Sequence, residues 1–209
     1  RINKNAKAIV MAKENGIIAG LQEFRLLYKD CILKFKKKDG EKIKKNDIIV
    51  EIDGNLKSLL KLERTGLNIL QRMSGIATIT YNLKKMLENL RFSAPTSLVI
   101  KNKVFIGATR KTYWGQLDKR AVRLGRGLTH RLNLSDAILI KDNHIRALNG
   151  NINNNIKKAL QLAAKNEKTG HIEIEVENEQ QAITAAKEII SLKAKNTKKI
   201  ARVVILKES

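Results

Sequence analysis

The sequence predicts a mixed α/β protein, with a sheet-rich N-terminal domain over residues 1–95 and a domain of βα units over residues 96–209. Three observations support this prediction. Short apolar runs separated by Gly-containing turns fill the first part of the chain. The apolar spacing then changes to a helical period from Leu59 to Leu90. After Pro95, strand candidates alternate with helix candidates, which is typical of parallel βα units.

The N-terminal domain is expected to be built from short strands. Residues 8–12 and 17–20 predict two strands joined by a turn at Gly16. Residues 31–35 predict a further strand that runs into Asp39-Gly40, a good hairpin turn, and residues 48–52 continue the apolar pattern.

The helical stripe between Leu59 and Leu90 contains two glycines, Gly66 and Gly75. Each glycine costs about 1 kcal/mol relative to alanine inside a helix. They therefore predict either a break between two helices or positions of close packing. Pro95, the only proline, marks the expected domain boundary.

The second domain contains about half the strands of an eight-stranded βα barrel. The predicted strands are residues 104–106, 137–140, 172–176 and 203–206, and the predicted helices are residues 117–124, 152–166 and 179–192.

The charge of the chain is unusual. Lys and Arg number 42 against 20 Asp and Glu, which gives a formal net charge of +22. Such an excess makes nucleic acid, anionic membranes and anionic small molecules candidate partners. The basic residues are dispersed, however, and Lys, Asn and Ile are abundant together, which favours a composition bias over a binding surface. The charge alone therefore identifies no function.

The sequence also indicates the compartment. Cys31 is the only cysteine, so an internal disulfide is impossible and a reducing compartment is expected. No apolar run approaches the roughly 18 residues of a membrane span. No N-terminal apolar stretch looks like a secretory signal. We therefore expect a soluble cytoplasmic protein with no membrane partner.

Polar side chains follow the predicted strands of the second domain at their C-terminal ends. They are Thr109-Arg110-Lys111-Thr112, Lys141-Asp142-Asn143-His144 and the glutamates Glu173, Glu175 and Glu177, with Thr129-His130-Arg131 in an intervening loop. In βα barrels these strand ends carry the active site. Arg presents a planar fork to carboxylates, and Lys presents a point charge to phosphates. Glutamates among such cations predict Mg²⁺ held together with a pyrophosphate group.

Each group also has an ordinary structural interpretation. Arg110 and Lys111 fit a solvated strand end, and Lys141 with Asp142 fits a surface ion pair of little energetic value. The alternating glutamates fit the outer face of an amphipathic strand. These interpretations weaken because all the groups fall at the same end of successive strands. The residues therefore favour a cationic binding site for a small polyanion.

Four motifs, in this order, resemble those of the quinolinate phosphoribosyltransferases, also called nicotinate-nucleotide pyrophosphorylases. The motifs are ERTGLNILQRMSGIAT at 63–78, TRKT at 109–112, GRGLTHR at 125–131 and LIKDNH at 139–144. The resemblance that they carry extends over nearly the whole chain. The resemblance implies an α/β fold with an N-terminal α/β sandwich domain followed by an incomplete, truncated βα barrel.

The resemblance also implies a substrate-binding set. Arg64, Arg110, His130 and Arg131 would hold the two carboxylates of quinolinate, with Thr109 in the same set. It further implies a homodimer or higher homo-oligomer in which Arg64 of one subunit reaches the partner's site.

Lys111 and Glu175 are the catalytic residues that the resemblance implies. Lys111 would lie near the reacting centre and also bind substrate, while Lys141 and Glu175 would face the ribose phosphate and its Mg²⁺ cofactor. The implied reaction makes nicotinate mononucleotide, CO₂ and pyrophosphate from quinolinate and phosphoribosyl pyrophosphate, a step of NAD biosynthesis.

The chain departs from the family pattern at several places. Tyr113-Trp114-Gly115 stands where many members carry Thr-Pro-Gly, and Arg126 replaces a middle glycine. The last predicted strand ends in residues 205–209 (ILKES), where the family usually has Leu-Asp-Asn. The later Gly-rich strand ends that bind the ribose phosphate, and the usual N-terminal segment, are expected to be missing. The alternatives are therefore a truncated, inactive remnant of that enzyme and, from the charge, a basic nucleic-acid-binding protein.

Overall fold

The computed structural model describes two compact units, Arg1–His130 and Arg131–Ser209. The described residues are 4–93, 106–109, 111–133, 136–166, 171–194 and 205–206. The domain boundary predicted at residues 95 and 96 lies outside the described residues and stays a prediction.

The first unit contains two small antiparallel sheets. One is three-stranded with the order β1 (Asn5–Met11), β5 (Ile48–Asn55) and β3 (Ile32–Phe35). The other pairs β2 (Gly16–Ile17) with β4 (Lys42–Ile43). The strands expected at residues 8–12, 31–35 and 48–52 are confirmed, whereas only Ile17 of the strand expected at residues 17–20 lies in a strand. Strand β1 pairs with β5 and not with β2.

The hairpin predicted at Asp39-Gly40 is wrong, because β3 pairs with β5 and β4 pairs with β2. Gly40 does form a turn with φ of 83°. The Asp39 carboxylate, however, accepts the Leu21 N–H at 2.9 Å, and the Gly40 N–H donates to the Ile18 carbonyl at 2.8 Å. These contacts tie the turn to the start of the next helix rather than close a hairpin.

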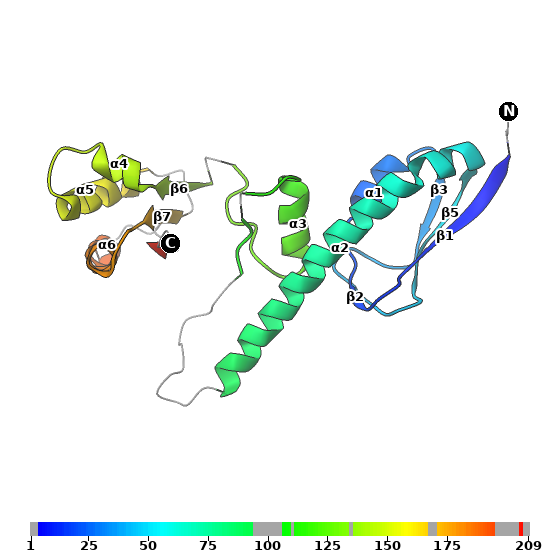
Figure 1. The fold of residues 1–209 in the computed structure, drawn as a ribbon, viewed down its shortest axis with the longest axis horizontal. Helices are drawn as coiled ribbons and strands as arrows, with labels where there is room; N and C mark the ends of the chain where they lie inside the picture. The colour runs from blue at the N-terminus through cyan, green and yellow to red at the C-terminus, as the bar shows by residue number, and fades with distance from the viewer. Residues whose placement is uncertain are drawn as a thin grey trace. The chain divides into compact units, whose positions relative to one another are not determined.

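Helix α2 (Leu56–Ser93) is one continuous helix, so the predicted break is wrong. The close-packing alternative is confirmed at Gly66, where an added Cβ would lie 2.8 Å from ring carbons of Phe24 and Tyr28. Those rings belong to α1 (Leu21–Leu27) and its C-cap, and they stack at a centroid distance of 4.3 Å. Figure 1 shows α1 and the three-stranded sheet beside the N-terminal half of α2.

Helix α3 (Gln116–Leu124) packs directly on the middle of α2 (Figure 1). The two helices approach so closely at Gly125 that an added Cβ would lie 2.3 Å from the Ala77 carbonyl oxygen. Met73, Ala77 and Ala121 form a fully buried contact there. This packing fixes the place of α3 within the first unit.

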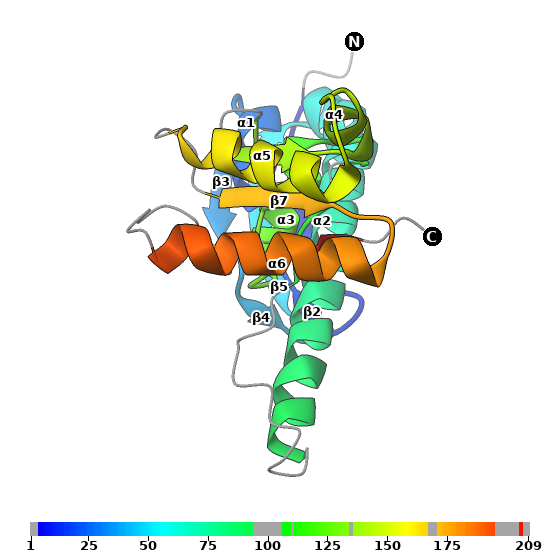
Figure 2. The same cartoon turned by 90° about the vertical axis from the view of Figure 1, so that its left-hand side faces the viewer.

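The second unit contains a parallel sheet with the order β6, β7, β8, as predicted. Its strands are β6 (Ala137–Ile140), β7 (His171–Glu175) and β8 (Ile205–Leu206), and its helices are α4 (Asp142–Arg146), α5 (Ile152–Ala164) and α6 (Glu179–Ala194). Figure 2 shows α5 and α6 running alongside β7. Ile156 and Leu160 of α5 pack with Ile174 of β7 and Ile189 of α6 in one apolar core.

The strand expected at residues 104–106 lies mostly outside the described residues. Residues 104 and 105 lie outside the described residues, and Ile106 is not in a strand. The next residue, Gly107, makes a single parallel bridge with Leu128. Gly107 therefore pairs with a residue of its own unit.

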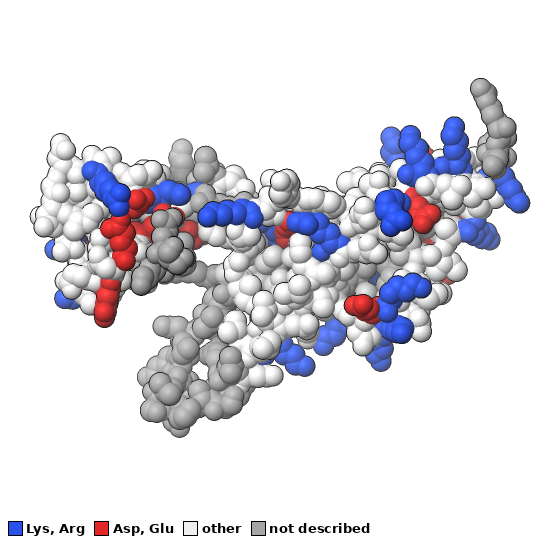
Figure 3. All heavy atoms as spheres, in the orientation of Figure 1, with Lys and Arg blue, Asp and Glu red and all other residues white. Residues whose placement is uncertain are grey.

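The basic residues do not gather in one place on the face that Figure 3 shows. Lys and Arg are scattered over both units, and several have Asp or Glu beside them. Lys36 contacts Glu51 at 2.9 Å, and Lys37 contacts Asp47 at 3.0 Å. Within the described ranges, every helix is too short or too polar to cross a bilayer.

Candidate functional site

Lys141 and Glu175 lie together at the C-terminal ends of neighbouring parallel strands. Lys141 follows β6, Glu175 ends β7, and the pairing of Ile140 with Ile174 brings the next residues side by side. The Lys141 Nζ lies 4.0 Å from Glu175 Oε1. This is a loose ion pair, in which both groups keep hydrogen-bonding capacity for a ligand.

The backbone around Lys141 is held more firmly than its side chain. Lys141 is the N-cap of α4, its N–H donates to His144 Nδ1 at 2.9 Å, and its carbonyl accepts the N–H of Ile145 at 3.1 Å. The side chain is 43% exposed. A fixed backbone with an accessible ammonium group suits the binding of an external anion.

Arg131 lies at the other end of β6 from Lys141. It is 7% exposed, and its guanidinium donates to the carbonyl of Ala137, the first residue of the strand, at 2.9 Å. Ala137 and Lys141 are separated by roughly 13 Å along a strand. The structure therefore does not bring Arg131 beside Lys141, and the role of Arg131 in quinolinate binding stays a prediction.

Two predicted segments lie side by side in the first unit. The Leu128 N–H donates to the Ile106 carbonyl at 2.8 Å, and the Ala108 N–H donates to the Leu128 carbonyl at 2.9 Å. This bridge places Gly107, two residues before Thr109, opposite Leu128, two residues before His130. The backbone pairing therefore brings together two of the motifs that resemble the family.

Gly127 permits this pairing by its lack of a side chain. An added Cβ would lie 2.6 Å from Val122 Cγ1 and 3.1 Å from the Ile106 carbonyl oxygen. The preceding Arg126 has φ of 69°, which favours glycine, and its guanidinium lies 5.4 Å from the centroid of the Tyr81 ring. Arg126, which stands where the family usually has glycine, therefore adopts a strained backbone conformation.

The remaining predicted residues of this unit are accessible or undescribed. Lys111 is exposed, and its backbone N–H donates to Thr109 Oγ1 at 3.0 Å. Arg64 is exposed on α2. Arg110 lies outside the described residues.

The structure also shows a polar cluster that the sequence analysis missed. Arg72 of α2 donates to both carboxylate oxygens of Asp118 in α3, at 2.8 Å from Nε and 2.7 Å from a terminal nitrogen. The Thr112 hydroxyl donates to the same carboxylate, and the guanidinium lies 5.1 Å from the centroid of the Trp114 ring. We call Arg72, Thr112, Trp114 and Asp118 the clasp.

The Asp118 carboxylate is the centre of the clasp. Its residue is 7% exposed, and the hydrogen bond from Arg72 holds the pKa of this carboxyl below its usual range. The Thr112 hydroxyl, the charge of Arg72 and the backbone N–H of Trp114 lower the pKa further, against the opposing effect of burial. A carboxylate satisfied by this many donors is structural and not available to a ligand.

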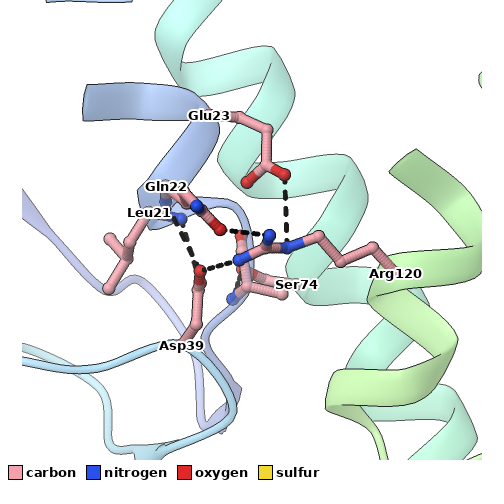
Figure 4. A network of polar contacts seen from close by, with 7 residues as sticks. Leu21, Gln22, Glu23, Asp39, Ser74 and Arg120 are labelled. Carbon is pink, nitrogen blue, oxygen red and sulfur yellow. Dashed lines mark hydrogen bonds and ion pairs between the residues drawn. The ribbon is translucent and has the colours of Figure 1, made fainter. Parts of the chain in front are cut away.

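The two residues that follow Asp118 make long-range contacts as well. Lys119, which is buried, donates to the Thr129 carbonyl at 3.3 Å. Arg120 contacts Glu23 at 3.2 Å and Asp39 at 2.9 Å and donates to Gln22, as Figure 4 shows. Three successive helical residues point in directions about 100° apart, so they do not all face solvent. Three successive charged residues in a predicted helix were therefore the sequence signal that at least one of them makes a contact within the protein.

The described residues contain no group of three His, Cys, Asp or Glu side chains arranged to hold a metal ion. Mg²⁺ usually keeps several waters and takes one or two carboxylates together with substrate phosphates. Glu175, at a strand end and beside a cation, fits that smaller requirement.

An open groove of about 490 Å³ lies on the first unit. Its lining includes Arg25, Phe35, Lys38 and Arg120, and no predicted site residue within the described ranges lines it. Most of its charges already have partners, including Arg120 with Asp39 and Lys37 with Asp47.

Comparison with known families gives a consistent result over both parts of the chain. The family model described as quinolinate phosphoribosyl transferase, N-terminal domain, matches residues 1–74. The corresponding C-terminal domain model matches residues 76–209.

The similar proteins carry names of the same kind. A probable nicotinate-nucleotide pyrophosphorylase (carboxylating) of Archaeoglobus fulgidus is 37% identical over 88% of this chain and 66% of its own length. A protein of the same name from Bacillus subtilis is 39% identical over 90% of this chain and 62% of its own length. The chain thus spans less than two thirds of these relatives, and neither is named for nucleic-acid binding.

Solved structures agree with the predicted α/β fold class. NadC from Streptococcus pyogenes superposes with a TM-score of 0.73 and 32% identity, over 100% of this chain and 74% of that one. The nicotinate-nucleotide pyrophosphorylase from Francisella tularensis superposes with a TM-score of 0.72 and 28% identity, over 99% of this chain and 75% of that one.

Proposed function

Because the chain belongs to the quinolinate phosphoribosyltransferase family, we propose that it makes nicotinate mononucleotide, CO₂ and pyrophosphate from quinolinate and phosphoribosyl pyrophosphate. The observation that carries the proposal is the match of both family domains, which together span the chain. The names of the relatives support the same transferase reaction in NAD biosynthesis.

We propose that cationic groups bind the two carboxylates of quinolinate. Arg64, Arg110, His130 and Arg131 are the residues proposed for this role, with Thr109 beside them. The parallel pairing of residues 106–108 with 128 supports a shared role for Thr109 and His130. The exposure of Arg64 on α2 is compatible with its donation to a partner subunit in a homodimer.

Lys111, Lys141 and Glu175 are proposed to act on the phosphoribosyl side. The quinolinate ring nitrogen attacks the anomeric carbon of the ribose while the bond to pyrophosphate breaks and pyrophosphate takes the electron pair. Lys141, whose ammonium is accessible, would stabilise the negative charge that develops on the leaving oxygens. Lys111 would lie near the reacting ring, where its positive charge orients the substrate.

Loss of CO₂ follows from the charge of the new pyridinium ring. The electrons of the broken carbon–carboxylate bond remain on the ring carbon next to the positive nitrogen, and a proton then replaces the lost group. The cations that hold the carboxylates must orient them without stabilising the leaving carboxylate in the ground state, because only transition-state binding accelerates the step.

We propose Mg²⁺ as the cofactor and the cytoplasm as the compartment. Mg²⁺ supplies charge neutralisation of the pyrophosphate group when it is bound. Glu175, with Lys141 beside it, is the described carboxylate proposed to hold it.

The decisive experiment mixes the protein with quinolinate, phosphoribosyl pyrophosphate and Mg²⁺ and measures nicotinate mononucleotide by chromatography. Arg110→Ala is expected to abolish quinolinate binding in calorimetry while circular dichroism stays unchanged. Lys84→Met, which removes an exposed cation from α2, is the matched control. Absence of both product formation and quinolinate binding in the unaltered chain would contradict the proposal.

A further inference from the structure

The clasp lies directly after the segment proposed to bind quinolinate. Thr112 follows Lys111 in the chain, and Trp114 lies two residues further on. The Thr112 hydroxyl donates to Asp118, and the Arg72 guanidinium lies 5.1 Å from the centroid of the Trp114 ring, so the Arg72–Asp118 pair contacts the two ends of a three-residue stretch. The exit of the TRKT motif is thus fixed at two points.

Asp118 is itself held in place by the fold. It lies in the first turn of α3, where a negative charge is favoured by the helix dipole. The close approach at Gly125 anchors the other end of α3 on α2, and the contacts of Arg120 with Glu23 and Asp39 anchor its side. The helix therefore provides a rigid base for the loop before it.

The same helix also contacts the second predicted segment of the first unit. The Lys119 ammonium donates to the Thr129 carbonyl at 3.3 Å, one residue before His130. His130 has φ of 56°, a conformation that needs support from its neighbours. Successive residues of α3 thus hold one point on each of the two segments that the parallel bridge brings together.

We propose that Arg72 and Asp118 are positioning residues, which hold residues 111–115 in the conformation that presents Thr109 and Lys111 to quinolinate. The inference rests on the proposed function for its ligand. Neither residue needs to touch the substrate, because Arg72 is committed to Asp118 through two hydrogen bonds and the Asp118 carboxylate also accepts the Thr112 hydroxyl. Lys in place of Arg72 would lose the fork geometry that makes both bonds at once.

Trp114 gives a direct readout of the clasp. It is the only tryptophan of the chain, and the Arg72 guanidinium lies 5.1 Å from the centroid of its ring. Intrinsic fluorescence excited in the indole band therefore reports on this site without a label. Hydrogen exchange of the backbone amides of residues 111–115 reports on the same segment independently of any ligand.

The test compares Arg72→Met with Lys84→Met, two cation-to-methionine changes on the same helix. Lys84 makes only a 3.9 Å contact with the exposed Glu88. Arg72→Met is expected to shift the Trp114 emission, to accelerate exchange at residues 111–115, and to weaken quinolinate binding about tenfold or more. Lys84→Met is expected to change none of these.

Thr112 supplies a milder pair of variants that keeps the ion pair intact. Thr112→Val removes the hydroxyl that donates to Asp118, and Thr112→Ser retains it. Thr112→Val is expected to accelerate exchange at residues 111–115 and to weaken quinolinate binding, while Thr112→Ser restores both. If circular dichroism shows that Arg72→Met does not fold, the two Thr112 variants still test whether the clasp holds this segment.

The outcomes separate the inference from the proposed function. If Trp114 fluorescence and hydrogen exchange are the same in Arg72→Met, Thr112→Val and Lys84→Met, the inference that the clasp holds this segment is wrong. Faster exchange with unchanged quinolinate affinity would overturn its positioning role. If the unaltered chain binds no quinolinate, the proposed function and the quinolinate-presenting role are both contradicted, while fluorescence and exchange still decide whether Arg72 and Asp118 hold the segment.

Discussion

The Arg72–Asp118 pair of the first unit and the Lys141–Glu175 pair of the second differ in almost every respect. Arg72 and Asp118 share two short hydrogen bonds, and the carboxylate accepts from further donors. Lys141 and Glu175 lie 4.0 Å apart, and the Lys141 side chain is 43% exposed. In a chain of net charge +22, satisfied charges of the first kind build the structure. Loosely paired charges of the second kind remain available for a ligand.

The largest effect that tests this comparison is expected from Asp118→Leu. The substitution removes the acceptor of Arg72 and Thr112 at once. Loss of a buried, multiply bonded acceptor costs roughly 1–3 kcal/mol. Urea denaturation followed by Trp114 fluorescence measures it. A loss no larger than that of an exposed substitution would show that the first pair is not structural.

Lys141→Met should show the opposite behaviour. Loss of a loose, partly exposed pair is expected to change the free energy of unfolding by less than about 1 kcal/mol. We expect the affinity for phosphoribosyl pyrophosphate with Mg²⁺ to fall about tenfold, or 1.4 kcal/mol. Calorimetry and urea denaturation of the same sample measure the two quantities. Reduced stability with unchanged affinity would reverse the assignment.

Acid titration gives a smaller effect that again distinguishes the pairs. The hydrogen bond from Arg72 lowers the pKa of Asp118 in the folded chain. An unfolded Asp titrates near a pH of about 3.9. The clasp therefore contributes its full stability above that pH and loses it as the pH falls through the lowered folded pKa. As the pH decreases, the free energy of unfolding, measured by urea denaturation, should fall less steeply in Asp118→Asn than in the unaltered chain. Equal slopes would contradict the assignment.

The smallest expected effect concerns Arg126, a charge that belongs to neither class. Its φ of 69° is strained for a side chain with a Cβ, while its guanidinium lies over Tyr81. Arg126→Gly removes the strain and the ring contact together, so the net change should stay within about 1 kcal/mol. Arg126→Ala keeps the strain and loses the contact, so it should be less stable than Arg126→Gly. Thermal denaturation compares the two variants, and the reverse order would exclude backbone strain.

Periodicity predicted the elements well but not their pairing. The spacing of apolar residues located β5, α2, β6 and α5, because burial of one face sets that spacing. It did not predict that β3 pairs with β5, because turn residues alone do not show where the Asp39 carboxylate binds. The short helices α1 and α4 were also missed, since neither is long enough to establish a helical period.

The candidate site was predictable only as far as the motifs reached. The position of both residues at the ends of predicted parallel strands correctly predicted that Lys141 lies next to Glu175. It did not show that Arg131 would be buried against the first residue of β6. Asp118, Lys119 and Arg120 were absent from the predicted set, because charged helical residues in a basic chain resemble an ordinary solvated face. Their partners, such as Arg72 and Thr129, are distant in the sequence.

The connection between β6 and α4 has a consequence for how this chain tolerates change in length. Strand β6 ends at Ile140 and α4 begins at Asp142, so Lys141 alone joins them. An insertion of one residue here would either turn the Lys141 amine away from Glu175 or remove the hydrogen bond from the Ile145 N–H to the Lys141 carbonyl, which begins α4. Alignment gaps and engineered linkers are therefore expected to be excluded from this junction.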